Sequence, residues 1–133
     1  MDTEKFAPIP AHTEAVAAAI IDAAIKVHKA LGPGLLESVY ESCLCYELSK
    51  RGIPFRRQVP MPVRFEEVHI ETGFRVDVIA DECAIAELKS AESIIPIHEA
   101  QLLTHFKLAN IRLGLLLNFN VPLMKQGIKR MVI

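Results

Sequence analysis

The segment from residue 74 to residue 89 constrains the fold of this chain more than any other part of the sequence. It reads FRVDVIADECAIAELK, two runs of alternating residues separated by Asp81, Glu82 and Cys83. Alternation with a period of two is typical of β-strands, and acidic residues between two such runs favour a tight turn. We therefore predict two antiparallel strands joined by a short loop.

The length of that loop decides which side chains share a face of the sheet. A three-residue loop sets Ala80 opposite Ala84 and Asp77 opposite Glu87, so both carboxylates point to one face. A two-residue loop would bury one carboxylate against apolar side chains, which costs several kcal/mol. We therefore predict the three-residue loop. The expected apolar face is Val76, Val78, Ala80, Ala84, Ala86 and Leu88, and the opposite face is Arg75, Asp77, Ile79, Ile85, Glu87 and Lys89.

Two carboxylates on facing strands repel each other unless a positive charge lies between them. Their Cβ atoms are about 5 Å apart, and Mg²⁺ commonly binds through one or two carboxylates plus water and phosphate oxygens. Lys89, on the same face as Glu87, would point toward a ligand of such an ion. The alternative is an ordinary surface ladder of salt bridges among Arg75, Asp77, Glu87 and Lys89, and the spacing alone favours neither interpretation.

Apolar periodicity predicts the remaining elements. Spacings of three and four indicate amphipathic helices, whereas β-branched alternation and short apolar runs indicate strands. The resulting order, ααβββαββ, predicts a single α/β or α+β domain with helices packed on a sheet. The helices are expected over residues 14–31, 36–50 and 97–111, and the strands within residues 55–88, at 113–117 and at 127–133.

Local signals refine these elements. Residues 1–12 show no periodicity and are expected to form an irregular lead-in, with Thr13 as the N-cap of the first helix. Pro60 and Pro62 interrupt the first strand, and proline cannot donate to a β-ladder. That strand is therefore expected at a sheet edge or to carry a bulge.

Composition excludes some classes of protein. The 15 Lys and Arg residues nearly cancel 16 Asp and Glu residues, so nucleic-acid binding would need a local basic patch. Three cysteines make a disulfide framework unexpected, and without an export signal we predict a cytoplasmic protein. The apolar runs are too short to cross a membrane. Hydrophobic residues make up 51% of the sequence, and a surplus of them can form a subunit interface, so a homo-oligomer is left as an open alternative.

Two clusters of basic residues are candidates for tracking a phosphate backbone, although such clusters are more often solvated surface. The clusters are Lys50, Arg51, Arg56 and Arg57, and Lys125, Lys129 and Arg130.

Three motifs of the chain resemble those of the GxxExxY family, small prokaryotic proteins assigned to the PD-(D/E)XK nuclease-like superfamily. GLLESVY at residues 34–40 matches the motif that names the family, VD at 76–77 followed by ELK at 87–89 matches the superfamily core, and HEAQLLTH at 98–105 resembles the next helix. The resemblance covers residue 15 to the C-terminus, and its specificity lies in the three motifs occurring in order.

The resemblance implies a restriction-endonuclease-like core, which is a central mixed β-sheet flanked by helices. It departs from the family at two positions. Val76 stands where the superfamily motif has proline, and His105 stands where related sequences often carry tyrosine. Neither change removes a proposed metal ligand.

The resemblance also implies an activity, namely hydrolysis of phosphodiester bonds in nucleic acid, DNA ahead of RNA, with Mg²⁺ or Mn²⁺. Asp77 and Glu87 would bind the metal, and Glu37 would be a further acidic ligand from a helix. Lys89 would position or activate the attacking water and stabilise charge on the phosphate, and Gln101 would orient water or substrate. The alternative is a non-catalytic binding or assembly module of the same fold, with or without metal binding.

Several nearby residues are interpreted as structural. Gly34 would allow a tight turn between helices, and Tyr40 would be a core aromatic residue whose hydroxyl reaches a partner. His98 and His105 share one polar stripe of a helix and are not expected to hold zinc. His28 is expected to be a packed or capping residue.

Overall fold

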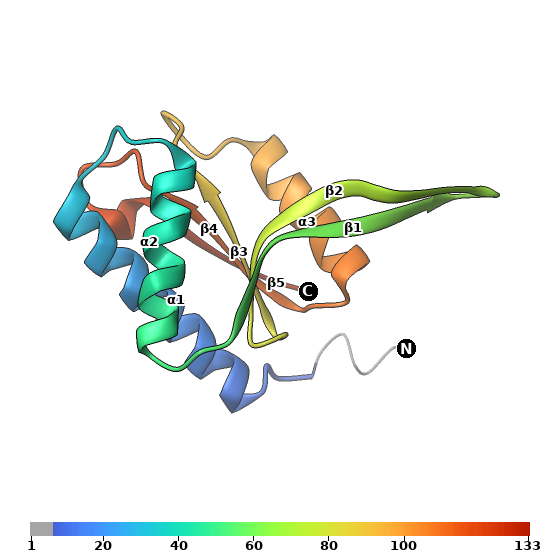
Figure 1. Cartoon of the computed structure of the whole chain (residues 1–133), viewed down its shortest axis with the longest axis horizontal. Coiled ribbons are helices and arrows are strands. Elements are labelled where there is room, and N and C mark those ends of the chain that lie inside the picture. Colours follow the sequence, from blue (N-terminus) through green and yellow to red (C-terminus); the bar gives the residue numbers. More distant parts are fainter. Residues whose placement is uncertain (1–6) are drawn as a thin grey trace.

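The computed structural model describes residues 7–133, which form helices packed around one five-stranded sheet (Figure 1). Apart from a short 3-10 helix, the elements follow the predicted order ααβββαββ. The helices are α1 (Ala11–Leu31), α2 (Glu37–Lys50), α3 (Pro96–Ala109) and the 3-10 helix η2 (Met124–Gly127). The strands are β1 (Phe55–Phe65), β2 (Val68–Ala80), β3 (Ala84–Lys89), β4 (Leu113–Asn118) and β5 (Ile128–Val132).

The sheet is mixed, with the strand order β1-β2-β3-β4-β5. β3 and β4 are parallel, and the other neighbouring strands are antiparallel. Parallel neighbours need a crossover connection, which α3 supplies. Every residue of β4 is buried, because this strand has a neighbour on each side and helices over both faces. The predicted buried strand at residues 113–117 is thus confirmed.

Helices cover both faces of the sheet (Figure 1). α1 and α2 pack on the face that carries the small side chains of Ala80, Ala84 and Ala86. α3 packs on the opposite face through Leu102 and Phe106. These two cores fix the direction from which each helix approaches the end of β3.

The β2–β3 hairpin has the predicted register. Ala80 pairs with Ala84 across a loop of residues 81–83. Asp81 and Glu82 have positive φ values of 46° and 55°, a region that aspartate adopts more readily than most residues. The three-residue loop is therefore confirmed.

The predicted apolar face of this hairpin is wrong at one position. Val76 packs beneath α3 together with Ile79 and Ile85, not beneath α1 and α2 with Val78. The reason is that β2 stops pairing with β3 beyond Val78 and diverges from it (Figure 1). Strict alternation does not continue through such a divergence.

The first helix begins earlier than predicted. α1 starts at Ala11, directly after Pro10, whose φ of −55° suits entry into a helix. Thr13 is buried within the first turn and makes no capping hydrogen bond, so the predicted N-cap is wrong. The irregular lead-in, predicted over residues 1–12, ends at Pro10, and its first six residues lie outside the described part of the chain.

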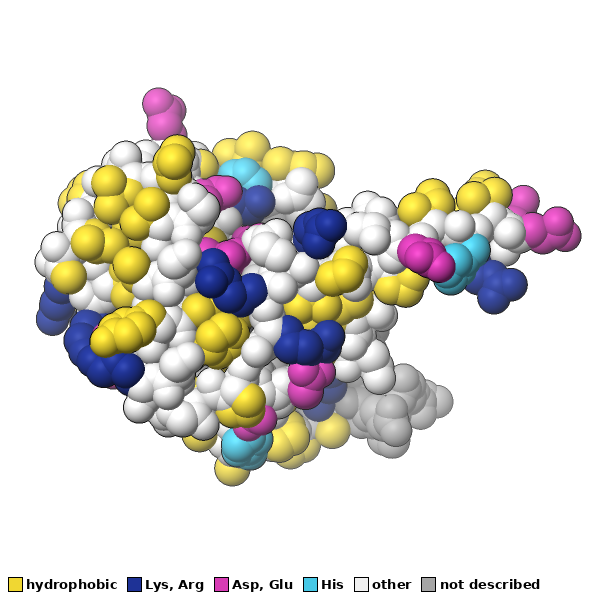
Figure 2. Space-filling model, in the orientation of Figure 1, with side chains coloured by type: hydrophobic (Ala, Val, Ile, Leu, Met, Phe, Trp, Pro, Cys, Tyr) yellow, Lys and Arg dark blue, Asp and Glu magenta, His cyan; other side chains and the backbone are white. Residues whose placement is uncertain are grey.

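The outer parts of β1 and β2, residues 62–73, form a two-stranded arm that projects from the rest of the molecule (Figures 1 and 2). Pro60 and Pro62 lie in β1, which is the edge strand. The register of the arm shifts between Met61 and Val63. The predicted edge position and the predicted irregularity are both confirmed.

One face of the arm is apolar and exposed. Val63 pairs with Ile70 and Phe65 pairs with Val68, so these four side chains share a face. The exposed fractions of Phe65, Val68 and Ile70 are 70%, 54% and 48%. The opposite face carries polar side chains such as Arg64. Along the arm, hydrophobic side chains extend to an acidic tip (Figure 2).

Two expectations from composition concern the described residues. The three cysteines are free, and burial raises the pKa of the Cys45 thiol to about 11. No helix within residues 7–133 is long and apolar enough to cross a membrane.

Candidate functional site

A groove of about 580 Å³ opens where β2 diverges from β3, and α3 forms its other wall. Five of its lining residues are the five predicted site residues: Glu37, Asp77, Glu87, Lys89 and Gln101. A second hollow of about 380 Å³ lies beside it and shares Glu37 and Asp77 with it. The fold thus gathers side chains from α2, β2, β3 and α3 into one place.

Asp77 lies at the point of divergence and is held by two donors. The backbone N–H of Leu88 donates to Oδ2 at 2.9 Å, and the side-chain amide of Gln58 donates to Oδ1 at 3.2 Å. Within residues 7–133, Asp77 has no cationic partner within ion-pair distance. Its charge therefore remains uncompensated beside the groove.

Glu87 is buried, with 5% of its surface exposed. The ring Nδ1 of His105 hydrogen-bonds Oε1 of Glu87 at 2.6 Å, and the ring of His105 stacks on Phe74. Burial raises the pKa of the Glu87 carboxyl above its ordinary value, the hydrogen bond from His105 opposes this, and the nearby charge of Asp77 adds to it. Asp77 and Glu87 are therefore close enough to interact.

The surface-ladder interpretation of these side chains is wrong. In the described part of the chain, no ion pair joins Arg75, Asp77, Glu87 and Lys89 to one another. α3 packs over the sheet face that carries Glu87, so Glu87 is not on a solvent-exposed face. Sequence spacing could not show this, because it does not tell where a later helix packs.

Lys89 and Gln101 line the groove and supply one cationic and one neutral amide side chain there. Lys89 is half-buried at the end of β3, and none of the ion pairs found in residues 7–133 includes it. Gln101 lies exposed on α3, near Thr104. A cationic and an amide group are thus available beside the carboxylates.

Glu37 is the first residue of α2 and is exposed at the groove. Its Oε1 accepts a hydrogen bond from the backbone N–H of Ser90 at 3.1 Å, and the hydroxyl of Ser90 donates to the carbonyl of Leu35 at 3.1 Å. These bonds connect the start of α2 to the chain directly after Lys89. Glu37 is thereby positioned by contacts outside its own helix.

Tyr40 and Gly34 hold the loop that leads to Glu37. The buried hydroxyl of Tyr40 donates to the carbonyl of Gly32 at 2.6 Å and accepts from the N–H of Leu35 at 3.1 Å. Gly34 has a φ of 95°, which side chains rarely adopt. The predicted structural roles of Gly34 and Tyr40 are therefore confirmed.

The histidines outside the groove have structural contacts. His28 is buried and its Nε2 lies 2.8 Å from the carbonyl oxygen of Val121, as expected for a packed residue. His98 accepts the N–H of Ile95 at the start of α3. His105, in contrast, lines the groove and contacts Glu87 directly.

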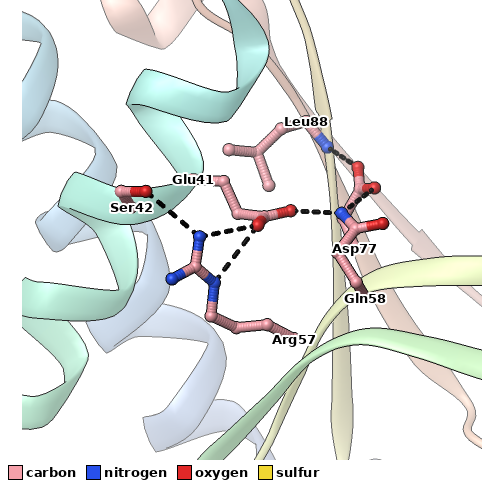
Figure 3. Close-up of polar contacts among 6 residues, drawn as sticks. All are labelled: Glu41, Ser42, Arg57, Gln58, Asp77 and Leu88. Atoms are coloured by element: carbon pink, nitrogen blue, oxygen red, sulfur yellow. Dashed lines mark hydrogen bonds and ion pairs between the residues drawn. The ribbon is translucent and has the colours of Figure 1, made fainter.

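A polar network beside Asp77 was not predicted from the sequence (Figure 3). The amide of Gln58 donates to Glu41 at 2.6 Å as well as to Asp77, and Arg57 pairs with Glu41 at 2.9 Å. Glu41 lies one helical turn after Glu37, and this spacing indicates from the sequence alone that the two carboxylates share a helix face. No sequence pattern indicates the role of Gln58, because its contacts depend on how α2 lies against the sheet.

The donor set fits a divalent cation of the Mg²⁺ type. Within residues 7–133, no three His, Cys, Asp or Glu side chains converge closely enough to hold a metal ion alone. Mg²⁺ does not require that, since it binds through one or two carboxylates and keeps several waters. Asp77 and Glu87 interact electrostatically, and both line the groove, so two carboxylates of the kind that Mg²⁺ prefers lie near each other.

Most residues of the two predicted basic clusters are occupied in ion pairs. In the first cluster, Arg51 pairs with Asp22, Arg56 with Glu82, Arg57 with Glu41 and Lys50 with Glu47. In the second, Lys129 pairs with Glu99 and Arg130 with Glu14. Neither cluster is therefore a free surface for a phosphate backbone.

Comparison with known proteins gives one match, which is to a family model. The family model of the PD-(D/E)XK nuclease superfamily matches residues 14–131. No curated protein and no solved structure matches the chain. The mixed sheet with helices on both faces agrees with the restriction-endonuclease-like fold of that superfamily. The chain therefore belongs to the PD-(D/E)XK nuclease superfamily.

Proposed function

We propose that this protein is a metal-dependent nuclease that hydrolyses phosphodiester bonds in nucleic acid, DNA ahead of RNA. One observation carries the proposal: Glu37, Asp77, Glu87, Lys89 and Gln101, from four separate elements, line a single groove. Separate structural roles for these residues would not account for their convergence. Nucleases of this superfamily generally use Mg²⁺ or Mn²⁺.

Asp77 and Glu87 would hold the ion. Glu37, predicted from the sequence as a third ligand, does not converge with them closely enough to bind the ion directly, so it would act through a water molecule. When bound, a divalent ion of this kind polarises phosphate oxygens and lowers the pKa of bound water. His105 donates to one oxygen of Glu87 and so fixes the direction of this carboxylate. Leu88 and Gln58 likewise fix the direction of the Asp77 carboxylate.

Lys89 and Gln101 would act on the substrate. A lysine without an anionic partner can bind a phosphate oxygen and stabilise the charge that develops there during hydrolysis. The amide of Gln101 can donate to or accept from a water molecule or substrate group. Both side chains come from rigid elements, β3 and α3, which favours a fixed geometry.

A cleavage assay tests this function. Linear, circular, single-stranded and branched DNA, and RNA, would be incubated with Mg²⁺ or Mn²⁺ and the wild type, Lys89→Ala or Asp77→Asn. We expect both variants to lose at least about a hundredfold in rate, as for lost groups that stabilise a transition state. Lys29→Ala, which removes an exposed lysine of α1 outside the groove and outside both basic clusters, is the matched control. Activity that survives both substitutions would refute the assignment.

The finer placement in the GxxExxY family belongs to the same proposal. It rests on Gly34, Glu37 and Tyr40, which belong to one local structure. Gly34 forms the turn, the Tyr40 hydroxyl hydrogen-bonds the loop before α2, and Glu37 places its carboxylate at the groove. We therefore interpret the family motif as the local structure that places the Glu37 carboxylate at the groove.

A second candidate function, as an assembly module, is favoured by the arm. An isolated two-stranded hairpin is marginal in water, and its exposed apolar face calls for a partner. We favour a second copy of the chain, because the apolar face of Val63, Phe65, Val68 and Ile70 is exposed and two such faces are alike in chemistry, as a two-fold symmetric contact requires.

A further inference from the structure

Gln58 lies between two carboxylates, those of Glu41 and Asp77 (Figure 3). Its Nε2 is 2.6 Å from Oε1 of Glu41 and 3.2 Å from Oδ1 of Asp77. Carboxylates only accept hydrogen bonds when ionised, so the NH₂ end of the amide must face both of them. The orientation of the Gln58 side chain is therefore unambiguous, and both of its N–H donors are used.

The other end of this network is anchored in α2. Glu41 is 6% exposed, and its second oxygen, Oε2, accepts from Arg57 Nη2 at 2.9 Å and from Nε at 3.2 Å. Arg57 also donates to the hydroxyl of Ser42 at 3.1 Å. The charge of Glu41 is thus compensated by Arg57, and Glu41 is a fixed acceptor for Gln58.

The chain adopts an unfavourable backbone conformation to place this amide. Gln58 has a φ of 46°, in the left-handed region that residues with a Cβ rarely occupy. Such conformations persist where the surrounding contacts determine them, and they are frequent at functional sites. Here the contacts that determine it are the two carboxylates.

We propose that Gln58 is a positioning residue that holds the Asp77 carboxylate in the direction needed for binding a divalent cation. Gln58 contacts Asp77 and lines the adjoining hollow with it, so it acts through Asp77. The inference rests on the proposed function, since it assumes that Asp77 is a metal ligand.

The choice of an amide has a physical reason. Lys or Arg at position 58 would satisfy both carboxylates too, but it would pair with the charge of Asp77 and compete with the cation. The amide orders Asp77 while leaving its charge available. Arg57 takes the compensating role at Glu41 instead, so the negative charge remains only where the ion would bind.

The test measures Mn²⁺ affinity by calorimetry for the wild type, Gln58→Gly and Gln58→Asn, without nucleic acid. Glycine and asparagine both tolerate positive φ, so neither variant strains the backbone. Glycine removes the amide, and asparagine carries it one methylene too short to reach both carboxylates. We expect Mn²⁺ binding to weaken about ten- to a hundredfold in each, as for other lost partners of metal ligands, with thermal unfolding within a few degrees of wild type.

Glu66→Gly is the matched control. Glu66 also has a positive φ, of 51°, but it lies in the β1–β2 turn, so this variant relaxes the backbone equally and should keep the wild-type Mn²⁺ affinity. Wild-type affinity in both Gln58 variants would overturn the positioning role alone. Absence of Mn²⁺ binding in the wild type would overturn the proposed function, and the positioning role with it.

Discussion

At the scale of single residues, the site holds charges that the fold does not compensate. Asp77 has no cationic partner within residues 7–133, and Glu87 is buried beside it with His105 as its hydrogen-bond partner. Repulsion and burial both disfavour the ionised form of Glu87. Charges that are buried or uncompensated in this way are expected to reduce the stability of the metal-free protein.

We therefore predict that Glu87→Gln stabilises the metal-free protein at neutral pH and abolishes cleavage. Because the pKa of Glu87 is raised in the folded state, the wild type loses stability as the pH rises above the ordinary carboxyl pKa of 4.5. Glutamine keeps an acceptor for His105 but carries no charge. Thermal unfolding in EDTA should show a gain of a few degrees at pH 7.5 that vanishes toward pH 4.

The control for this prediction is Glu92→Gln, which removes an exposed carboxylate after β3. It should change the unfolding temperature little at either pH. A Glu87→Gln protein that is less stable than wild type at neutral pH would contradict the account of Glu87.

The sequence was sufficient to predict the five groove residues but not the residues that support them. Asp77, Glu87 and Lys89 follow from strand alternation together with a family motif. Gln58 and the contact made by His105 depend on how α2 and α3 pack against the sheet. Such contacts join residues far apart in the sequence, and no local pattern encodes them.

At the scale of elements, the position of α3 sets one wall of the groove. α3 packs closely on β4 at Gly114, where an added Cβ would lie 2.6 Å from Cε1 of Phe106 and 3.0 Å from Cδ1 of Leu102. A glycine here lets the helix approach the sheet. The same helix carries Gln101 and His105 at the groove.

We predict that Gly114→Ala lowers the free energy of unfolding by about 1–3 kcal/mol, the usual range for overpacking a core. The displaced α3 should also reduce cleavage more than the loss of stability explains. Urea unfolding and the cleavage assay, both at a temperature where the variant is folded, measure the two effects.

Phe106→Leu combined with Gly114→Ala provides the matched control. Leucine removes the ring atoms that the new methyl group would contact, so the double variant should recover part of the stability. A Gly114→Ala protein that is as stable and as active as the wild type would contradict the proposed role of close packing between α3 and β4.

Among the elements, the helix and strand order was predictable and some details were not. The alternation of residues 76–88 and the prolines of β1 gave the correct register and the correct edge. Alternation predicts the wrong core for Val76, because β2 diverges from β3 at the site itself. The sequence predicts Thr13 as the cap because it does not show that the helix already begins after Pro10.

At the scale of the whole molecule, the arm and the ion pairs determine which surfaces remain for partners. Most residues of the two basic clusters form ion pairs within the protein, so these clusters offer little unpaired positive charge for binding a phosphate backbone. The apolar face of the arm, in contrast, is exposed. Composition indicated a surplus of apolar residues, but only the fold shows where part of it lies.

We predict that the apolar face of the arm mediates self-association. Light scattering across a dilution series should show a mass that approaches twice the monomer at high concentration for the wild type. Phe65→Ser should remain monomeric, because Phe65 is the most exposed residue of that face. His69→Ser, on the polar face of the arm, should behave as the wild type. A wild type that is monomeric at every concentration would contradict the prediction.

The central claim is that the groove holds a divalent cation between two carboxylates and uses it for hydrolysis. The most direct test is a crystal structure of the protein soaked with Mn²⁺, with anomalous scattering used to locate the ion. The account predicts one strong peak in contact with both Asp77 and Glu87. No peak at these carboxylates at millimolar Mn²⁺, or a peak only elsewhere, would contradict it.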